Sequence, residues 1–188
     1  MAQPASRASA HDLELAALAA AGDRLAFGEL VRRHGPGVRG LLRRMGADGA
    51  LADDLAQDAF LAAFEQIAEF RGQGAFAGWI KRIAARLYVK RWRRDARYEL
   101  LGEAEDGLSE DPRASTERRI DLDDALRTLS AAERMCVSLC YGAGLSHAEA
   151  AAALNAPLGT VKSHVKRGLD KLKARLAPDA SAGLADHG

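Results

Sequence analysis

Several features are scarce in this sequence, and each scarcity excludes a class of protein. Only two of the 188 residues are cysteines, too few for a disulfide-rich scaffold. Aromatic residues make up 5% of the chain, and no segment shows the alternation of β-branched residues that predicts a strand. No apolar run approaches the roughly 20 residues that cross a bilayer. Alanine and leucine dominate instead, and this composition predicts an all-α protein.

The N-terminal segment, MAQPASRASA, lacks the apolar core of a signal peptide. We therefore expect a cytoplasmic protein without direct membrane insertion. Residues 1–11 and 177–188 are mostly small and polar, and we predict that both ends are disordered.

Charge is nearly balanced overall, at a formal net charge of +1, but it is unevenly distributed. The segment 81–97 holds eight basic residues against the single acidic residue Asp95. The stretch 98–111 has no basic residue and contains six acidic ones: Glu99, Glu103, Glu105, Asp106, Glu110 and Asp111. This segregation predicts a polyanion-binding surface beside an acidic linker over residues 97–116.

The stretch 144–176 has the pattern of two short helices joined by a tight turn. Ser146 and Glu149 have the spacing of a capping box, which starts an alanine-rich helix. The turn at 155–159 contains asparagine, proline and glycine, which interrupt a helix. Thr160 is the expected cap of the second helix.

The second helix of this pair is amphipathic. Its apolar residues recur every three or four positions and form one stripe: Val161, Val165, Leu169, Leu172 and Leu176. A helical hairpin inside an ordinary bundle would also show such a stripe. The caps and the basic opposite face favour a DNA-binding helix-turn-helix whose second helix enters the major groove. Its predicted DNA contacts are Thr160, Lys162, Ser163, His164, Lys166, Arg167 and Lys171.

The first half of the chain reads as a series of helices. We expect helices over 13–21, with Asp12 as its cap, and over 24–34, 38–45 and 50–68. Gly35, Pro36 and Gly37 are expected to separate the second from the third, because proline lacks a backbone donor. A basic helix over 76–94 follows, with these residues on its apolar side: Phe76, Trp79, Ile80, Ile83 and Leu87.

The second half is expected to begin near Thr116, with one helix marked by Leu126 and Leu129. Ser130 and Glu133 form a second capping box, which starts a helix to Tyr141. Cys136 and Cys140 lie four residues apart on that helix, with His147 near in sequence. A thiol or metal sensor is one interpretation, but a zinc site needs four ligands, so two buried small side chains are favoured.

Four stretches in this order resemble a known family: AAGDRLAFGELVRRH at 20–34, DDLAQDAFLAAF at 53–64, FAGWIKRIA at 76–84 and LSHAEAAAALNAPLGTVKSHVKRGLDKL at 145–172. Together with the acidic linker, they are similar to the extracytoplasmic-function (ECF) sigma factors, small two-domain initiation factors of bacterial RNA polymerase. The resemblance covers nearly all of residues 12–176. It implies a region 2-like domain at 12–96 and a region 4-like helix-turn-helix domain at 117–176.

The resemblance also implies binding roles. The first domain would bind the clamp of the largest polymerase subunit through Asp53, Asp54, Gln57 and Asp58. The loop 70–75 would capture a flipped base of the minus-ten promoter element. The same element would be contacted by Arg71, Gln73, Lys81, Arg82, Arg86, Lys90, Arg93 and Arg94. The second domain would bind the flap of the other large subunit and read the minus-thirty-five element. An anti-sigma factor, membrane-bound in many relatives, is expected to hold the chain inactive.

The sequence departs from the family pattern at three positions. Arg86 stands where asparagine is often found, Lys90 where aspartate is found, and His164 where arginine is common. The first two changes make the basic helix more basic, and the third bears on the base preference of the upstream helix. All three concern the promoter sequence rather than the class.

No nucleophile–base pair, metal cluster or phosphate loop stands out, so we expect no catalytic residue, metal or cofactor. The alternative function is a stand-alone helix-turn-helix regulator, which would leave the basic helix 76–94 without a role. We also predict that the free chain is compact, with the acidic linker or domain contacts covering part of its DNA surface.

Overall fold

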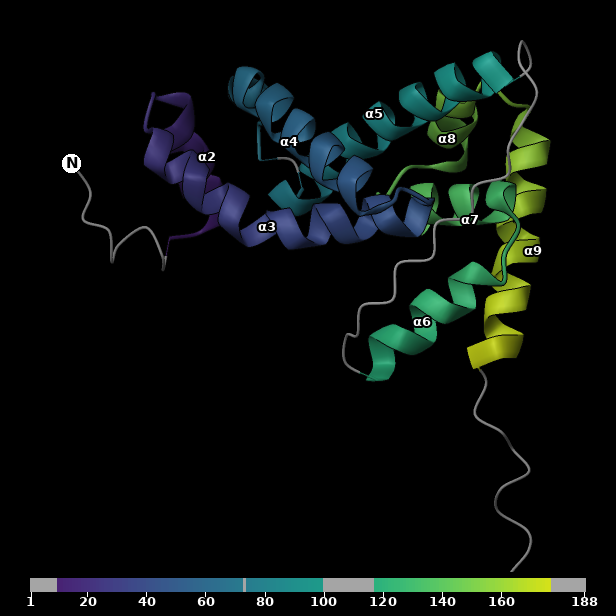
Figure 1. The fold of residues 1–188 in the computed structure, drawn as a ribbon. Helices are drawn as coiled ribbons and strands as arrows, with labels where there is room; N and C mark the ends of the chain where they lie inside the picture. The colour runs from purple at the N-terminus through teal and green to yellow at the C-terminus, as the bar shows by residue number, and fades with distance from the viewer. Residues whose placement is uncertain (1–9, 73, 100–116, 177–188) are drawn as a thin grey trace, which may run out of the picture.

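The computed structural model describes residues 10–72, 74–99 and 117–176, and over these ranges it is helical, with no strand among them (Figure 1). The all-α prediction is therefore confirmed. The predicted disordered ends and most of the predicted linker fall outside the described residues. Within the described ranges, no helix combines the length and apolar character needed to cross a membrane.

The first region is built around one long helix. Its elements are α2 (Asp12–Ala20), α3 (Arg24–Met45), α4 (Gly49–Glu65), the 3-10 turn η1 (Ile67–Glu69) and α5 (Phe76–Glu99). Helices α2, α4 and α5 all contact α3, which runs along the base of the region (Figure 1). The four helices bury a common set of side chains that includes Leu15, Leu30, Phe60 and Ile80.

The predicted break in α3 is wrong, because the helix continues through Pro36. Proline inside a helix costs about 3 kcal/mol relative to alanine. The turns after it place Val38, Leu41, Leu42 and Met45 in the core at 0–3% exposure. Burying each such side chain contributes about 1.5–3 kcal/mol, so tertiary packing outweighs the local preference.

Two predicted N-caps are also wrong. Asp12 is the first residue of α2, and its carboxylate pairs with Arg33 and His34 rather than with the backbone of its own helix. Helix α9 begins at Leu158, so Thr160 lies within its first turn. The amides of Thr160 and Val161 donate to the Pro157 carbonyl, at 3.0 and 3.2 Å, so the helix begins directly after this proline and earlier than expected.

The second region consists of α6 (Glu117–Arg127), α7 (Ala131–Val137), the π-helical turn η2 (Ser138–Gly142), α8 (His147–Leu154) and α9 (Leu158–Leu176). Both predicted capping boxes are confirmed. Each serine hydroxyl accepts from an amide of the first turn, and each glutamate accepts from the serine amide, at 3.1 Å for Ser130 and 2.8 Å for Ser146. Asn155 ends α8 in the left-handed conformation, at φ 53°.

The two regions are packed together. One buried cluster includes Leu41 and Tyr88 of the first region and Met135, Leu139 and Leu145 of the second. Figure 1 shows α7 beside the C-terminal end of α3 and α8 beside the second half of α5. A smaller cluster holds α6 against α7 and α9: Ala125, Leu126, Leu129, Val137 and Leu172. Close packing of the two regions agrees with the predicted compactness, whereas covering by the linker concerns residues 100–116 and stays a prediction.

Candidate nucleic-acid and polymerase interfaces

Helix α4 presents an exposed acidic face. Its apolar side is buried through small residues and Leu55, so the opposite face lies in solvent. That face carries all four predicted clamp-binding residues, each exposed: Asp53, Asp54, Gln57 and Asp58. Asp53 also lies 3.6 Å from Nε of Arg39 on α3, which partly compensates its charge. The face ends at Leu61, a leucine with 56% exposure.

Helix α5 separates apolar from basic side chains as its sequence predicts. Phe76 and Ile80 are buried, and Tyr88 donates from its hydroxyl to the Met45 carbonyl at 3.2 Å. The predicted DNA contacts on this helix are exposed except Lys81, which is half-buried: Arg82, Arg86, Lys90, Arg93 and Arg94. Trp79 is half-buried against Phe70 and Phe76, whereas Trp92 is 42% exposed.

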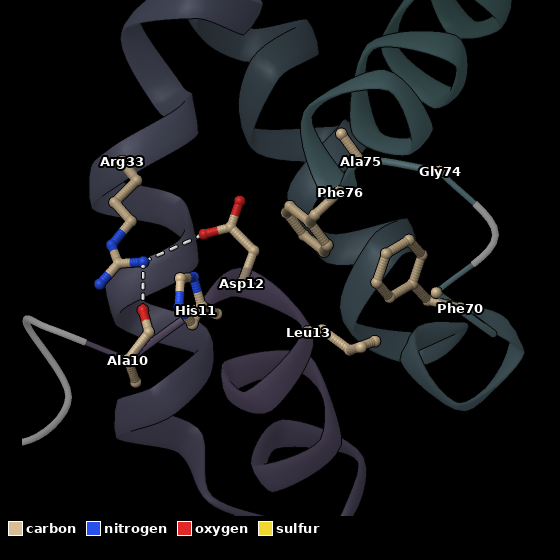
Figure 2. Close-up of a pocket in the computed structure, with 10 residues that line it drawn as sticks. Ala10, His11, Asp12, Leu13, Arg33, Phe70, Gly74, Ala75 and Phe76 are labelled. Atoms are coloured by element: carbon tan, nitrogen blue, oxygen red, sulfur yellow. Dashed lines mark hydrogen bonds and ion pairs between the residues drawn. The ribbon is translucent and has the colours of Figure 1, made fainter.

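A pocket of about 570 Å³ lies beside the loop that precedes α5 (Figure 2). Phe70 and Phe76 form its apolar side and meet edge to face, with ring centroids 5.4 Å apart. Across from them lie the first turn of α2, with Asp12 and Leu13, and Arg33 of α3. Its walls combine two aromatic rings with a carboxylate and a guanidinium, which suits a flat polar ring. Of the predicted loop contacts, Arg71 is exposed and Gln73 lies outside the described residues.

The polar wall of this pocket is held by an ion-pair chain. Arg33 donates from Nη1 to the Ala10 carbonyl at 2.8 Å and to Asp12 at 3.1 Å, and from Nε to Glu29 at 2.8 Å. Hydrogen bonds from Arg32 and Arg33 lower the pKa of Glu29 from 4.5 to about 2. Glu29 is therefore a charged partner of Arg33 at neutral pH, and the bonds from Arg33 to Ala10 and Asp12 hold the start of α2 against α3.

One glycine allows this arrangement. Gly72 has φ +70°, which favours glycine, and a Cβ there would lie 2.6 Å from Cδ1 of Leu13, so any other residue would strain the loop and displace the exposed leucine. The loop was predicted from the sequence, but the opposite wall of the pocket was not. Asp12 and Arg33 were missed because ion pairs between neighbouring helices leave no short motif.

Helix α9 carries the predicted upstream contacts on its outer surface. Val161 and Val165 are buried, Leu169 is half-buried, and Leu176 is 43% exposed, so the predicted stripe faces inward for all but its last residue. Six of the seven predicted DNA contacts are exposed and His164 is half-buried: Thr160, Lys162, Ser163, Lys166, Arg167 and Lys171. Ser163 donates to the Gly159 carbonyl at 2.9 Å, which occupies its hydroxyl hydrogen.

Two of these cations have a partner within the protein that the sequence analysis missed. Lys171 Nζ lies 2.7 Å from the buried carboxylate of Glu133, and Arg167 Nε lies 3.6 Å from it. The hydrogen bond from Lys171 is the main cause that lowers the pKa of Glu133. The capping-box pattern explained Glu133 locally and so concealed its contact with α9.

The two cysteines lie in adjoining helical segments, Cys136 in α7 and Cys140 in η2. Cys136 is buried and Cys140 is half-buried, and both are free thiols. Burial raises the pKa of Cys136 to about 11 and also raises the pKa of Cys140, so both thiols are protonated and unreactive at neutral pH. No cluster of three or more histidine, cysteine or acidic residues suited to a metal ion occurs within the described ranges.

Family models match both halves of the chain. Residues 30–98 match Sigma-70 region 2, and residues 125–174 match Sigma-70, region 4. The first match contains the acidic face of α4, the loop and the basic helix α5. The second contains the helix-turn-helix of α8 and α9.

Two curated relatives span almost the same length. The ECF RNA polymerase sigma factor SigM of Mycobacterium tuberculosis is 36% identical over 174 residues, which cover 92% of this chain and 88% of the relative. The RNA polymerase sigma factor NccH of Alcaligenes xylosoxydans xylosoxydans is 35% identical over 175 residues, which cover 88% of this chain and 94% of the relative.

Solved structures show the same relationship. CnrH, solved in complex with the cytosolic domain of CnrY, is 32% identical and has a TM-score of 0.52, with 90% of this chain and 99% of that chain covered. The sigma factor RpoE, solved with the anti-sigma factor NepR from Bartonella quintana, shares the fold at 24% identity and a TM-score of 0.59, with 81% and 98% covered. The chain belongs to the ECF sigma factors of RNA polymerase.

Proposed function

We propose that this sigma factor uses three separate surfaces: the acidic face of α4 for core polymerase, the loop pocket with α5 for the minus-ten element, and α9 for the minus-thirty-five element. The observation that carries this division is that the three surfaces lie on three different helices, one acidic and two basic. The acidic α4 face suits a basic protein surface, while α5 and α9 suit the DNA backbone. The chain would act by binding alone, with no catalytic group of its own.

The pocket beside Phe70 and Phe76 is the proposed site for the flipped base of the minus-ten element. Bases that are taken out of a stack bind between aromatic or apolar side chains and are held by polar groups at their edges. The two phenylalanine rings supply the apolar surface, and Asp12 and Arg33 supply an acceptor and a donor beside it. Arg71 and Gln73 complete the proposed downstream surface with the basic residues of α5.

The clamp interface is tested by replacing Asp54, Gln57 and Asp58 together with alanine. These side chains are exposed, so the triple variant should fold normally. We expect weaker binding to core polymerase in pull-down and titration experiments. The matched control replaces Glu65 and Gln66, which are exposed at the end of the same helix. If the triple variant bound core polymerase with wild-type affinity, this face would be ordinary solvated surface and not an interface.

The alternative of a stand-alone helix-turn-helix regulator makes the opposite prediction. Such a protein would bind its DNA without core polymerase, and the α4 variant would behave like the wild type in every assay. Promoter-dependent transcription in vitro by core polymerase plus this chain, and none by either alone, separates the two.

We also propose control by an anti-sigma factor, in the cytoplasm or at the membrane. RpoE was solved with the anti-sigma factor NepR and CnrH with the cytosolic domain of CnrY, and the match to CnrH covers 90% of this chain. The chain isolated from unstressed cells should then be recovered with an inhibitor and without core polymerase. Recovery mainly with core under all conditions would contradict this.

A further inference from the structure

Glu133 is a buried charged residue, at 4% exposure, and it is shared by two helices. It caps α7 by accepting from the Ser130 amide at 3.1 Å. The same carboxylate pairs with two cations of α9, Lys171 at 2.7 Å and Arg167 at 3.6 Å. A buried carboxylate requires charged or hydrogen-bonding partners, and here the proposed recognition helix supplies two of them.

Helix α9 approaches α7 very closely at Gly168. Gly168 lies between the two cations in sequence, and a Cβ there would be 2.8 Å from Val137 Cγ2 and 3.6 Å from Glu133 Cβ. The backbone of α9 is therefore seated directly on α7 at the level of Glu133. Small rotations of α9 would move both cations away from the carboxylate.

Arg167 is held at two points of its guanidinium. Nε faces Glu133, and Nη2 lies 3.0 Å from Nδ1 of His164. Arginine only donates, so Nδ1 of His164 must be the acceptor. Nη1 and the second hydrogen of Nη2 are left for an external acceptor, and the side chain is 57% exposed. A guanidinium oriented in this way loses little freedom when it binds a planar acceptor pair.

We propose that Glu133 is a positioning residue for upstream-element recognition. It orients Arg167 for a bidentate contact with a guanine edge, and it keeps Lys171 as a tether between α9 and α7. This inference rests on the proposed role of α9 in reading DNA.

The test replaces Glu133 with glutamine. Glutamine keeps the capping box, so α7 should still form, while the charge that orients Arg167 is removed. Holoenzyme made from core polymerase and the variant would select DNA from a pool with a randomised upstream element. We expect roughly a tenfold loss of preference at one base pair, since a bidentate contact discriminates by about 1–3 kcal/mol. Non-specific DNA binding should rise, because two cations lose their counter-charge.

Two further variants make the result interpretable. R167K removes the planar fork and should flatten preference at the same base pair. D170N makes the same change in charge on the exposed side of α9 and should raise binding to all sequences alike, with the preference intact. Thermal unfolding checks that E133Q remains folded at the temperature of the selection.

The possible outcomes separate the two claims. If wild-type holoenzyme shows no upstream preference, the proposed role of α9 fails. If the wild type is selective and E133Q is equally selective, or loses affinity uniformly for all sequences, the positioning role is wrong.

A second, independent set of contacts joins the two regions across the basic face of α5. Arg82 donates to the Gly144 carbonyl at 2.9 Å, and Arg93 donates to the Ala153 carbonyl at 3.4 Å. Beside them, Arg86, Lys90 and Arg94 line a groove of about 570 Å³ whose other side is formed by Ala152 and Ala153 of α8. The proposed minus-ten surface is therefore partly occupied by the second region.

The same interface is anchored at the C-terminal end of α3. Arg44 Nε pairs with Asp123 at 2.8 Å. The guanidinium of Arg134, from α7, lies against Gly46, where a Cβ would be 2.9 Å from Nη2. A cation at this place is favoured by the negative end of the α3 dipole. Gly142 meets Leu41 so closely that a Cβ would lie 2.6 Å from Leu41 Cδ1.

We infer that this packed arrangement is an autoinhibited form, which must open before α5 can bind minus-ten DNA along its full basic face. G142V tests it, because the added side chain would strike Leu41 of the first region. The matched control is G28V, where a Cβ meets nothing within 4 Å. We expect G142V to increase the radius of gyration in X-ray scattering. It should also raise binding of a random single-stranded oligonucleotide several-fold, with G28V unchanged.

A charge reversal provides the second route. R44D should open the chain in the same direction, and R44D/D123R should restore the wild-type values. The inhibitory role would be overturned if scattering showed both variants expanded but neither bound single-stranded DNA better than the wild type. The inhibitory role would also be overturned if R44D stayed compact and bound single-stranded DNA like the wild type while G142V misfolded.

Discussion

The two proposed DNA-binding helices differ in what holds their basic residues. On α5, Arg82 and Arg93 donate to carbonyls of the other region, and their neighbours line the groove between the regions. On α9, the exposed cations either lie in solvent or pair with Glu133 of their own region. The accessibility of the basic residues on α5 therefore depends on the position of the second region. The basic residues on α9 are instead held by contacts within the second region itself.

This difference indicates where regulation and specificity reside. A surface that is covered by another part of the chain can be switched by separating the two parts. A surface whose side chains are held by contacts within one small domain keeps the same geometry whether the chain is free or bound. We therefore expect upstream recognition to be constitutive and downstream recognition to depend on opening.

The largest expected effect comes from removing the α9 contacts. Alanine at Lys162, Ser163, Lys166 and Arg167 should reduce upstream-element protection by the holoenzyme on the order of 100-fold or more, since each base contact is worth about 1–3 kcal/mol. Footprinting measures the loss, and circular dichroism checks that the helices remain. Intact upstream protection would show that α9 does not dock in the groove.

The corresponding α5 variant should behave differently in the free and bound states. Alanine at Arg86, Lys90 and Arg94 should weaken strand opening at the minus-ten element by the holoenzyme, roughly tenfold. Binding of DNA by the free chain should change much less, because α8 already covers part of this face. Permanganate reactivity of the opened bases measures the first quantity and a filter-binding titration the second. Equal losses in both would remove the distinction between α5 and α9.

The packing of α9 on α7 should be sensitive to a single methyl group added at Gly168. In G168A the added Cβ would lie 2.8 Å from Val137 Cγ2, on buried side chains that have little room to move. Overpacking of this kind costs typically about 1–3 kcal/mol. Chemical denaturation should therefore show a lower stability for G168A but not for G28A, whose Cβ meets nothing within 4 Å. Equal stabilities would mean that α7 and α9 can separate slightly without cost.

Features that depend on neighbours in sequence could be predicted. Both capping boxes, the turn at Asn155 and the inward stripe of α9 follow from local spacing, and the structure contains all of them. The exposed positions of Asp54, Gln57 and Asp58 also followed from helical periodicity. In each case the controlling interaction spans only a few residues.

Features that depend on distant partners could not be predicted. Pro36 reads as a helix breaker until the buried side chains beyond it are seen. Asp12 reads as a cap until Arg33 and His34 are placed beside it. The pairing of Glu133 with Lys171 joins residues 38 apart, and that of Arg44 with Asp123 joins residues 79 apart. No short motif contains such pairs, so the contacts that hold α9 emerged only from the fold. Covering of the DNA surface by the linker or by domain contacts was predicted, but the residues of α5 that the second region contacts were not.

The smallest expected effect concerns acid, and it compares one anchored carboxylate from each region. Glu29, with a pKa of about 2 in the folded chain, supports Arg33 beside the proposed base pocket, and Glu133 supports α9. A carboxyl whose pKa is lowered by folding stabilises the protein above its ordinary value of 4.5, and this contribution disappears as the pH falls toward the folded value. Stability should therefore fall between about pH 4.5 and pH 2. In E29Q that fall should be shallower, with stability at pH 7 modestly reduced, because Arg32, one partner of the half-buried Glu29, is 69% exposed and its ion pair is screened by solvent. Denaturation midpoints measured at several pH values for the wild type, E29Q and E133Q check this. If stability fell with pH in E29Q as it does in the wild type, and fell less in E133Q, the carboxylate responsible for acid sensitivity would lie in the second region alone.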